Sequence, residues 1–170
     1  MPGAVSIKSN LTGGELEDTL LNLASIPPNP ALNPKFVDPS MLATATLAVP
    51  CMPYKIVFAY EGLGKAAAAE RLNAFYNEHT EIPETRRADI IIVNRTLCIV
   101  NSGPMGTMMR ANNANVDPNR FVVQTGPNIT AFAFMYLLSM LQQYAHIASG
   151  VTMRFGSYLN KMPFETTPSK

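Results

Sequence analysis

The chain has 170 residues, of which 47% are hydrophobic and only 15% are charged, against about 25% charged in typical globular domains. This balance excludes a wholly disordered chain, because disorder requires low hydrophobicity and high net charge. The net charge is +1, so no overall basic field indicates nucleic acid and no acidic field indicates a basic partner. The length corresponds to one domain, or at most one and a half.

The N-terminal part of the chain predicts a strand over residues 4–8 and a helix over residues 13–25. Thr12 and Glu15 have the spacing of a capping box at the start of that helix. Residues 26–53 hold seven of the fourteen prolines, which predicts a long irregular insertion. Loops of this length are usually functional or mobile, although a plain surface connection is the simpler interpretation here.

The middle of the chain alternates strands and helices. Its patterns predict a strand over 54–60, a helix over 65–80 and strands over 88–93, 97–100 and 121–124. Asn94 and Arg95 suit a tight hairpin turn between two of these strands. Alternation of this kind predicts an α/β fold with a central mixed sheet of about five strands flanked by helices.

The last predicted helix covers residues 129–148 and lies within an uncharged stretch. No Asp, Glu, Lys or Arg occurs from Phe121 to Met153. The helix is long enough to cross a bilayer, but Gln142, Gln143 and His146 lie inside it. We therefore expect no membrane span, and instead a helix buried in the core or in an oligomer interface.

Two cysteines, Cys51 and Cys98, are too few for a disulfide framework. Cys98 lies in an apolar run, which predicts a buried side chain. No group of His and Cys has zinc-site spacing. The first residues lack a basic-then-apolar signal layout, so a cytoplasmic location is expected.

Three segments, in this order, resemble a known family. The strand and helix start at residues 4–18 contain Val5-Ser6-Ile7-Lys8-Ser9-Asn10-Leu11-Thr12. The strand at 53–60 reads Pro-Tyr-Lys-Ile-Val-Phe-Ala-Tyr, and an Asp-led apolar strand and an apolar helix follow at 88–93 and 129–144. Together they resemble an uncharacterised bacterial and phage branch of the restriction-endonuclease-like PD-(D/E)xK superfamily, over about residues 4–145. The resemblance implies a nuclease-like α/β domain at 1–150, with the Pro-rich insertion 26–53, and a C-terminal tail at 151–170.

The resemblance also implies which catalytic residues should be present and which are missing. It matches Lys8 to the catalytic lysine, and it places Ser6 where the superfamily has a metal-binding acid. A hydroxyl is a poor ligand for Mg²⁺, which takes carboxylates, water and phosphate. A second metal-binding Asp belongs on a strand before residue 4, where this chain begins, so we expect a truncated, incomplete restriction-endonuclease-like core.

Four other acids could be proposed as substitute metal ligands. Glu15, Glu17 and Asp18 fit a first helical turn better, because acids there favour the helix dipole and Glu15 completes a cap. Asp89 is better interpreted as a strand-edge residue or as a partner of Arg86 or Arg87. We therefore expect no metal or other cofactor, unless an active nuclease is completed by a partner chain and then uses Mg²⁺.

Two apolar features predict contact with another chain. The strand that carries Ser6 lacks the hairpin that flanks it in the parent topology, and an exposed strand edge favours pairing. The last helix, if uncovered, presents an apolar face, which normally marks an interface. The residues expected in that interface are Phe132, Phe134, Met135, Leu138 and Leu141.

Two further segments are candidates for binding. The Met-rich loop 103–110 either adapts to a partner surface or packs on the sheet. A phosphate could be bound if one face gathered Ser6 with the arginines, although Glu81, Glu84 and Asp89 offset much of the charge. The arginines concerned are Arg86, Arg87, Arg95 and Arg110.

These observations predict a catalytically inactive nuclease-fold protein that acts by binding, as a homo-oligomer or as a subunit of a larger assembly. The resemblance suggests a phage or mobile-element origin, and hence a host-cytoplasm location. One alternative is a metal-dependent nuclease that completes its site with a partner chain. The other is a structural protein that forms a lattice. Nucleic acid remains a possible partner.

Overall fold

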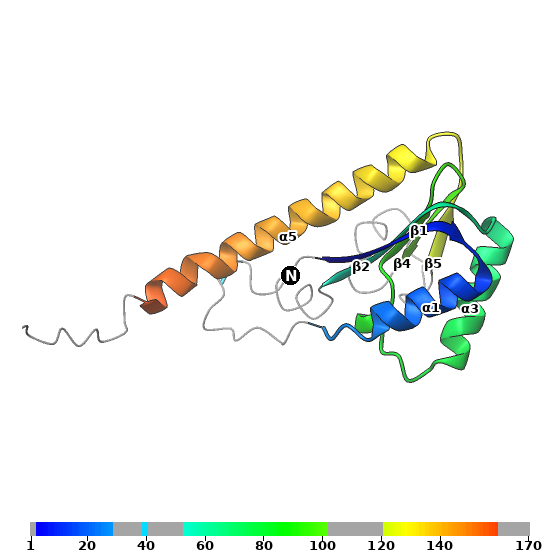
Figure 1. Ribbon diagram of the computed structural model, residues 1–170. Helices are drawn as coiled ribbons and strands as arrows, with labels where there is room; N and C mark the ends of the chain where they lie inside the picture. The colour runs from blue at the N-terminus through cyan, green and yellow to red at the C-terminus, as the bar shows by residue number, and fades with distance from the viewer. Residues whose placement is uncertain (1–2, 29–38, 41–52, 102–120, 160–170) are drawn as a thin grey trace, which may run out of the picture.

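The computed structural model describes residues 3–28, 39–40, 53–101 and 121–159, without the side chains of residues 143 and 147–159. The described elements run in the following order: β1 (Gly3–Leu11), α1 (Gly13–Ala24), β2 (Tyr54–Gly62), α3 (Lys65–Glu78), the 3-10 turn η3 (Glu84–Arg86), β3 (Ile90–Val93), β4 (Leu97–Asn101), β5 (Phe121–Gln124) and α5 (Ile129–Leu159). The expected α/β class and the five-stranded mixed sheet with flanking helices are confirmed (Figure 1).

The sheet follows the chain order, β1-β2-β3-β4-β5. The β1–β2 and β2–β3 pairs are parallel, whereas the β3–β4 and β4–β5 pairs are antiparallel. The change of direction occurs at the predicted hairpin, where Arg95 has a φ of 59°. A left-handed residue of this kind closes short hairpin loops. Among the described strands, β1 has a neighbour on one side only.

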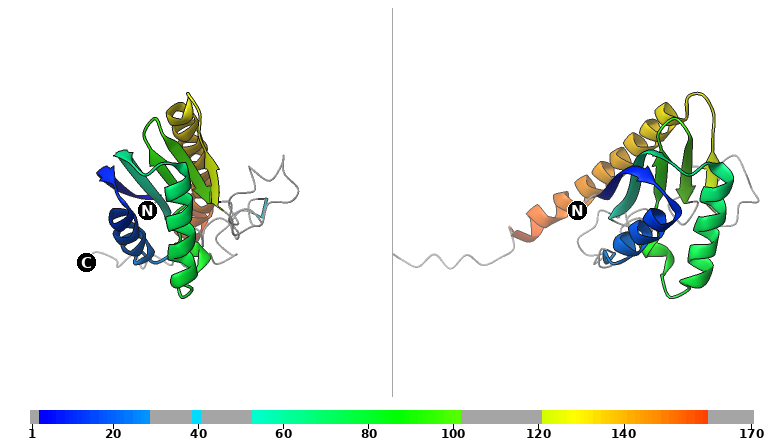
Figure 2. Two further views of the ribbon diagram at one scale, coloured as in Figure 1. Left: turned by 90° about the vertical axis from the view of Figure 1, so that its right-hand side faces the viewer. Right: turned by 45° about the vertical axis from the view of Figure 1, so that its right-hand side comes forward.

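The helices form a layer on each face of the sheet (Figure 2). The strand order advances in one direction, so the right-handed crossover rule puts α1 and α3 on the same face. Leucines of α1 and residues of α3 meet one side of the sheet in the larger core: Leu16, Leu20, Leu23, Leu72, Phe75, Val57, Ile91 and Ile99. The other side of the sheet packs against α5 through Ile90, Ile92, Cys98, Val100, Ile129, Ala133 and Met140.

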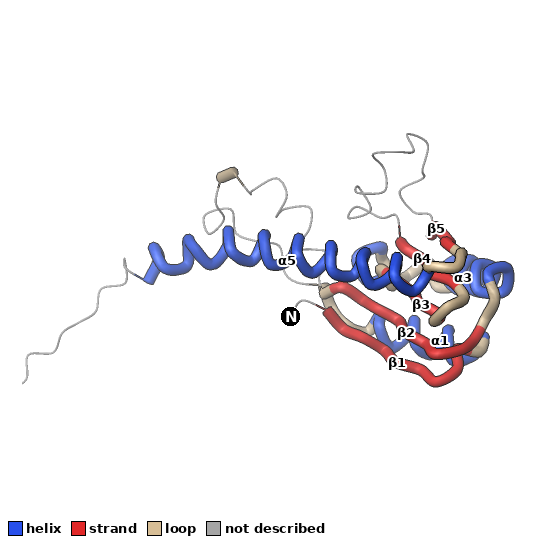
Figure 3. Tube along the Cα trace, turned by 90° about the horizontal axis from the view of Figure 1, so that it is seen from above, coloured by secondary structure: helices blue, strands red, loops and turns tan. Residues whose placement is uncertain are grey.

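The start of α5 is fixed by the β3–β4 hairpin. The Thr130 hydroxyl accepts a hydrogen bond from the Arg95 backbone N–H at 2.9 Å and donates to the Asn94 Oδ1 at 3.1 Å. From this point α5 crosses the sheet face on the side of β3 and β4, and β1 lies beside it (Figure 3). Tyr54 and Ile56 of β2 are buried in the α5 cluster, whereas Val5 and Ile7 of β1 stay exposed. The position of α5 therefore decides which part of the sheet face stays bare.

The helix α5 is longer than its sequence pattern predicted. It has 31 residues and ends at Leu159, whereas the pattern predicted an end at residue 148. Gly150 lies inside the helix, because a glycine within a helix costs only about 1 kcal/mol. The predicted boundary between residues 150 and 151 consequently lies within a continuous helix. None of the helices in the described ranges is long and apolar enough to cross a membrane.

Some expectations lie outside the described residues. These are most of the Pro-rich insertion (residues 29–38 and 41–52), the loop 103–110 with Arg110, Cys51, and the tail from residue 160. Cys98 is fully buried in β4, as its apolar run predicted, and burial raises the pKa of its thiol to about 12.

Candidate functional site

Ser6 and Lys8 lie two positions apart on β1 and share the face of the strand toward α1. The Lys8 ammonium forms an ion pair with the Glu15 carboxylate in the first turn of α1. The Thr12 hydroxyl accepts the Glu15 N–H at 3.3 Å, which is half of the predicted capping box. Because the Glu15 carboxylate contacts Lys8, the lysine has an acid partner that the sequence interpretation had assigned to the helix cap alone.

The remaining acids do not join this pair. Glu17 forms an ion pair with Arg71 at 3.3 Å, and Asp18 is exposed. Within the described ranges, no group of three or more His, Cys, Asp or Glu side chains could hold a metal ion. The pair of Lys8 and Glu15 thus offers one carboxylate and one ammonium beside the Ser6 hydroxyl.

Asp89 lies at the opposite end of the parallel strands, directly before β3. Its Oδ2 accepts the Lys55 backbone N–H at 2.7 Å, and among the described residues it forms no ion pair with Arg86 or Arg87. Burial raises the pKa of the Asp89 carboxyl to about 7, although the Lys55 N–H and the Lys55 charge act in the other direction. Asp89 is therefore a strand-end residue level with Lys55, whereas Lys8 is level with Ala59, four residues further along β2.

The Lys55 side chain is fully buried beneath this end of the sheet. Its ammonium donates to the Pro53 carbonyl at 3.1 Å and to the Thr85 carbonyl at 3.0 Å. Carbonyl partners of this kind satisfy a buried ammonium that would otherwise be costly. Lys55 consequently anchors the segment before β3, and sequence analysis treated it only as part of a strand.

The three described arginines proposed for phosphate binding lie near opposite ends of β3. The Arg87 guanidinium lies 4.9 Å from the centre of the Tyr76 ring, which is a cation–π contact. Arg86 ends η3 near the start of β3, and Arg95 is in the hairpin beyond the other end of that strand. Arg110 lies outside the described residues.

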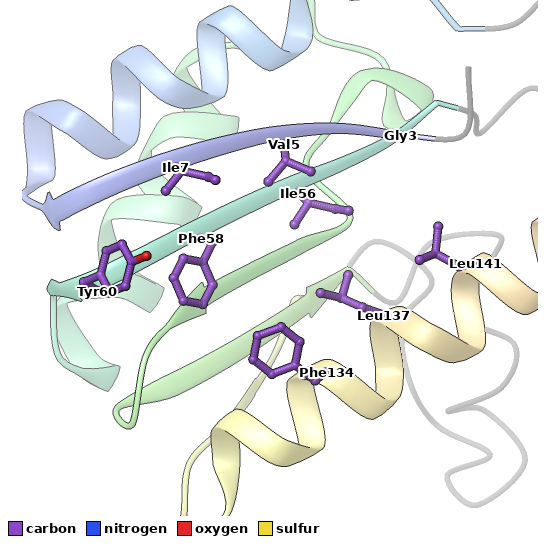
Figure 4. A pocket seen from close by; sticks show the side chains of 9 residues that line it. All are labelled: Gly3, Val5, Ile7, Ile56, Phe58, Tyr60, Phe134, Leu137 and Leu141. Atoms are coloured by element: carbon purple, nitrogen blue, oxygen red, sulfur yellow. The ribbon is translucent and has the colours of Figure 1, made fainter.

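An apolar depression lies between β1 and β2 on one side and α5 on the other, and we name it the β1–α5 groove. It has a volume of about 570 Å³. It is lined by Gly3, Val5, Ile7, Ile56, Phe58, Tyr60, Phe134, Leu137 and Leu141 (Figure 4). None of these residues is charged, and the Tyr60 hydroxyl is their only polar side-chain group.

The floor of the groove consists of apolar side chains that the fold leaves exposed. Val5, Ile7 and Tyr60 are 56%, 65% and 60% exposed. The register sets Val5 beside Ile56 and Ile7 beside Phe58, so their side chains form one continuous surface. Exposed apolar surface of this extent normally marks an interaction site.

The residues predicted for the interface are all exposed on α5. Phe134 and Leu141 line the groove, whereas Met135 and Leu138 are the most exposed of the set, at 72% and 65%. Phe132 lies on another side of the helix and lines a smaller cavity of about 240 Å³ at the start of α5. The predicted set thus divides between the groove and the outer surface of α5.

Sequence analysis did not identify the floor of the groove. The available signal was the alternation of Val5 and Ile7 with Ser6 and Lys8, which gives β1 one apolar face. Residues 54–60 of β2 are apolar on both faces apart from Lys55. That pattern does not indicate whether a helix covers the face.

No family model, curated protein or solved structure matches the chain.

Proposed function

We propose that the chain is a catalytically inactive nuclease-fold protein that acts by binding another protein chain through the β1–α5 groove, as an oligomer or as a subunit of a larger assembly. The single observation that carries this proposal is the groove itself. It is apolar, it is open to solvent, and it is lined by six residues of β1 and β2 and by three residues of α5. An apolar partner would displace water from this surface, and the free energy of binding would gain about 25 cal/mol for each Å² of apolar surface covered.

The nuclease-fold part of the proposal rests on the resemblance of residues 4–18, 53–60, 88–93 and 129–144 to the restriction-endonuclease-like superfamily. The loss of catalysis is supported by Ser6, which supplies no carboxylate beside Lys8. It is also supported by Asp89, whose carboxyl accepts a backbone N–H at the far end of the sheet. A magnesium site of carboxylates and water needs acids closer together.

One contact favours a second function, a metal-dependent nuclease that is completed by a partner chain. The Glu15 carboxylate lies against Lys8, so an acid and a lysine are adjacent on the face that carries Ser6. A partner that supplied further carboxylates could share a metal ion with Glu15. This function requires Mg²⁺, whereas the binding function requires no cofactor.

Metal titration and cleavage assays separate the two functions. For the binding function, calorimetric titration of the chain with Mg²⁺ or Mn²⁺ should detect no tight site, and DNA and RNA should remain uncut. The free energy of unfolding of the variant Lys8→Ala should lie within about 1 kcal/mol of the wild-type value, because a surface ion pair contributes little to stability. Lys65→Ala, which removes an exposed lysine at the start of α3, is the matched control.

The opposite result would be metal-dependent cleavage that Lys8→Ala and Glu15→Gln abolish and Lys65→Ala preserves. That result would establish the nuclease function and refute the proposal. Salt-sensitive nucleic-acid binding without cleavage would retain the inactive fold but replace the protein partner with nucleic acid.

A further inference from the structure

The outer surface of α5 carries a second apolar feature beside the groove. Residues three and four positions apart along the helix form one exposed stripe, which we name the α5 seam. At about 100° per residue they lie on one side of the helix, and the spacing is that of helices which pack knobs into holes. The seam consists of Ala131, Phe134, Leu138, Leu141 and Ala145.

The length of α5 points to a partner that is also a long helix. Its 31 residues extend about 46 Å at 1.5 Å per residue, whereas the nine residues of β1 extend about 30 Å. Figure 1 shows the C-terminal part of α5 projecting past the sheet. No Asp, Glu, Lys or Arg occurs in α5 before Arg154, so most of the helix carries no formal charge of its own that would oppose an apolar partner.

We infer that the occupant of the β1–α5 groove is the α5 helix of a second copy of this chain, which packs antiparallel along the α5 seam. The inference rests on the proposed function and names its partner. Each chain has a half-covered sheet face and a helix with an apolar outer side. A two-fold axis between the helices would place each α5 over the other chain's β1 and β2 and would cover both features at once.

Symmetry and charge support a second copy over an unrelated helix. A two-fold interface needs one patch that complements itself, and here the groove and the seam share Phe134 and Leu141. The lining of the groove and the seam contain no charged side chain, so two copies meet without like-charge repulsion. The net charge of +1 per chain adds little long-range repulsion.

Sedimentation of the full chain over the micromolar range tests the inference. The expected species has twice the chain mass of 18.5 kDa. Leu138→Asp should raise the dimer dissociation constant by roughly 100-fold or more, because it buries an unpaired carboxylate in the seam. Leu138 is 65% exposed in the single chain, so the variant should fold, which circular dichroism checks.

Asn73→Asp is the control, because it adds the same charge to an exposed position of α3 and should leave the dimer unchanged. Phe134→Asp should weaken the dimer as Leu138→Asp does. Spin labels on paired Asn128→Cys variants should lie about 35 Å apart in an antiparallel pair centred between residues 138 and 141. Labels on Gln142→Cys should lie much closer together. A Cys51→Ser background leaves only the buried thiol of Cys98.

A folded monomer throughout the micromolar range would overturn the second-copy partner and leave the binding function to a different chain. A dimer that both Asp variants leave intact would also overturn it. Growth into open assemblies would contradict a closed two-fold pair and support a lattice. Lys8-dependent cleavage, measured on the same samples, would instead refute the proposed function.

Discussion

Gly62→Ala should lower the free energy of unfolding by roughly 3 kcal/mol or more. Gly62 ends β2 with a φ of 151°, a backbone conformation that essentially only glycine adopts. A Cβ atom there would lie 2.7 Å from the Leu11 carbonyl oxygen and 2.9 Å from the Leu11 nitrogen. Both contacts are with backbone, so no side-chain rotation relieves them, and the β1–β2 pairing would have to shift.

Chemical denaturation measures this effect against Gly14→Ala. Gly14 is an exposed residue in the first turn of α1, and a Cβ atom there meets nothing within 4 Å. Alanine should therefore stabilise that helix by up to about 1 kcal/mol. If the free energy of unfolding of Gly62→Ala lay within about 0.5 kcal/mol of the wild-type value, the close approach to Leu11 would not constrain the structure.

Raising the pH from about 4 to about 7 should destabilise the protein through Asp89. Burial raises the pKa of this carboxyl to about 7 in the folded chain, whereas an unfolded Asp titrates at about 3.9. Between these values the folded state holds a proton that the unfolded state has lost, so the stability falls as the pH rises. At about 1.4 kcal/mol for each pKa unit, the total loss approaches about 4 kcal/mol.

Asp89→Asn isolates this contribution. Its amide oxygen can still accept the Lys55 N–H, but the side chain cannot ionise. The variant should be more stable than the wild type at pH 8, with a flatter dependence of unfolding free energy on pH. Asp18→Asn, at an exposed position of α1, should follow the wild-type curve. Equal slopes for the wild type and Asp89→Asn between pH 4 and 7 would contradict the assignment.

The elements of the fold could be predicted from sequence because their signals are local. The β-branched and aromatic residues of 54–60 and the Thr12 cap each act over a few residues, and β2 and α1 begin where these signals place them. The predicted end at residue 148 was too early, and Gly150 weakens the helix without ending it. The prediction of Cys98 as buried succeeded because it lies in the apolar run Leu97 to Val100.

The contacts within the candidate site could not be predicted in the same way. The spacing of Thr12 and Glu15 predicts a contact within the helix cap. The ion pair of Glu15 with Lys8 arises because β1 runs beside the start of α1. The Asp89 and Lys55 contact joins residues 34 positions apart, which depends on the strand register. The α5 pattern predicted an apolar helix, but which side stays exposed depends on where the β3–β4 hairpin holds Thr130.

The parallel pairing of β1 with β2 also affects the order of events during folding. Gly3 pairs with Tyr54, so the chain must close a loop of about fifty residues before this contact forms. By contrast, the β3–β4 hairpin joins Val93 to Leu97. Local contacts form sooner, because closing a long loop costs entropy first. During synthesis β1 leaves the ribosome before β2, so its pairing with β2 cannot be completed until Gly62 has followed.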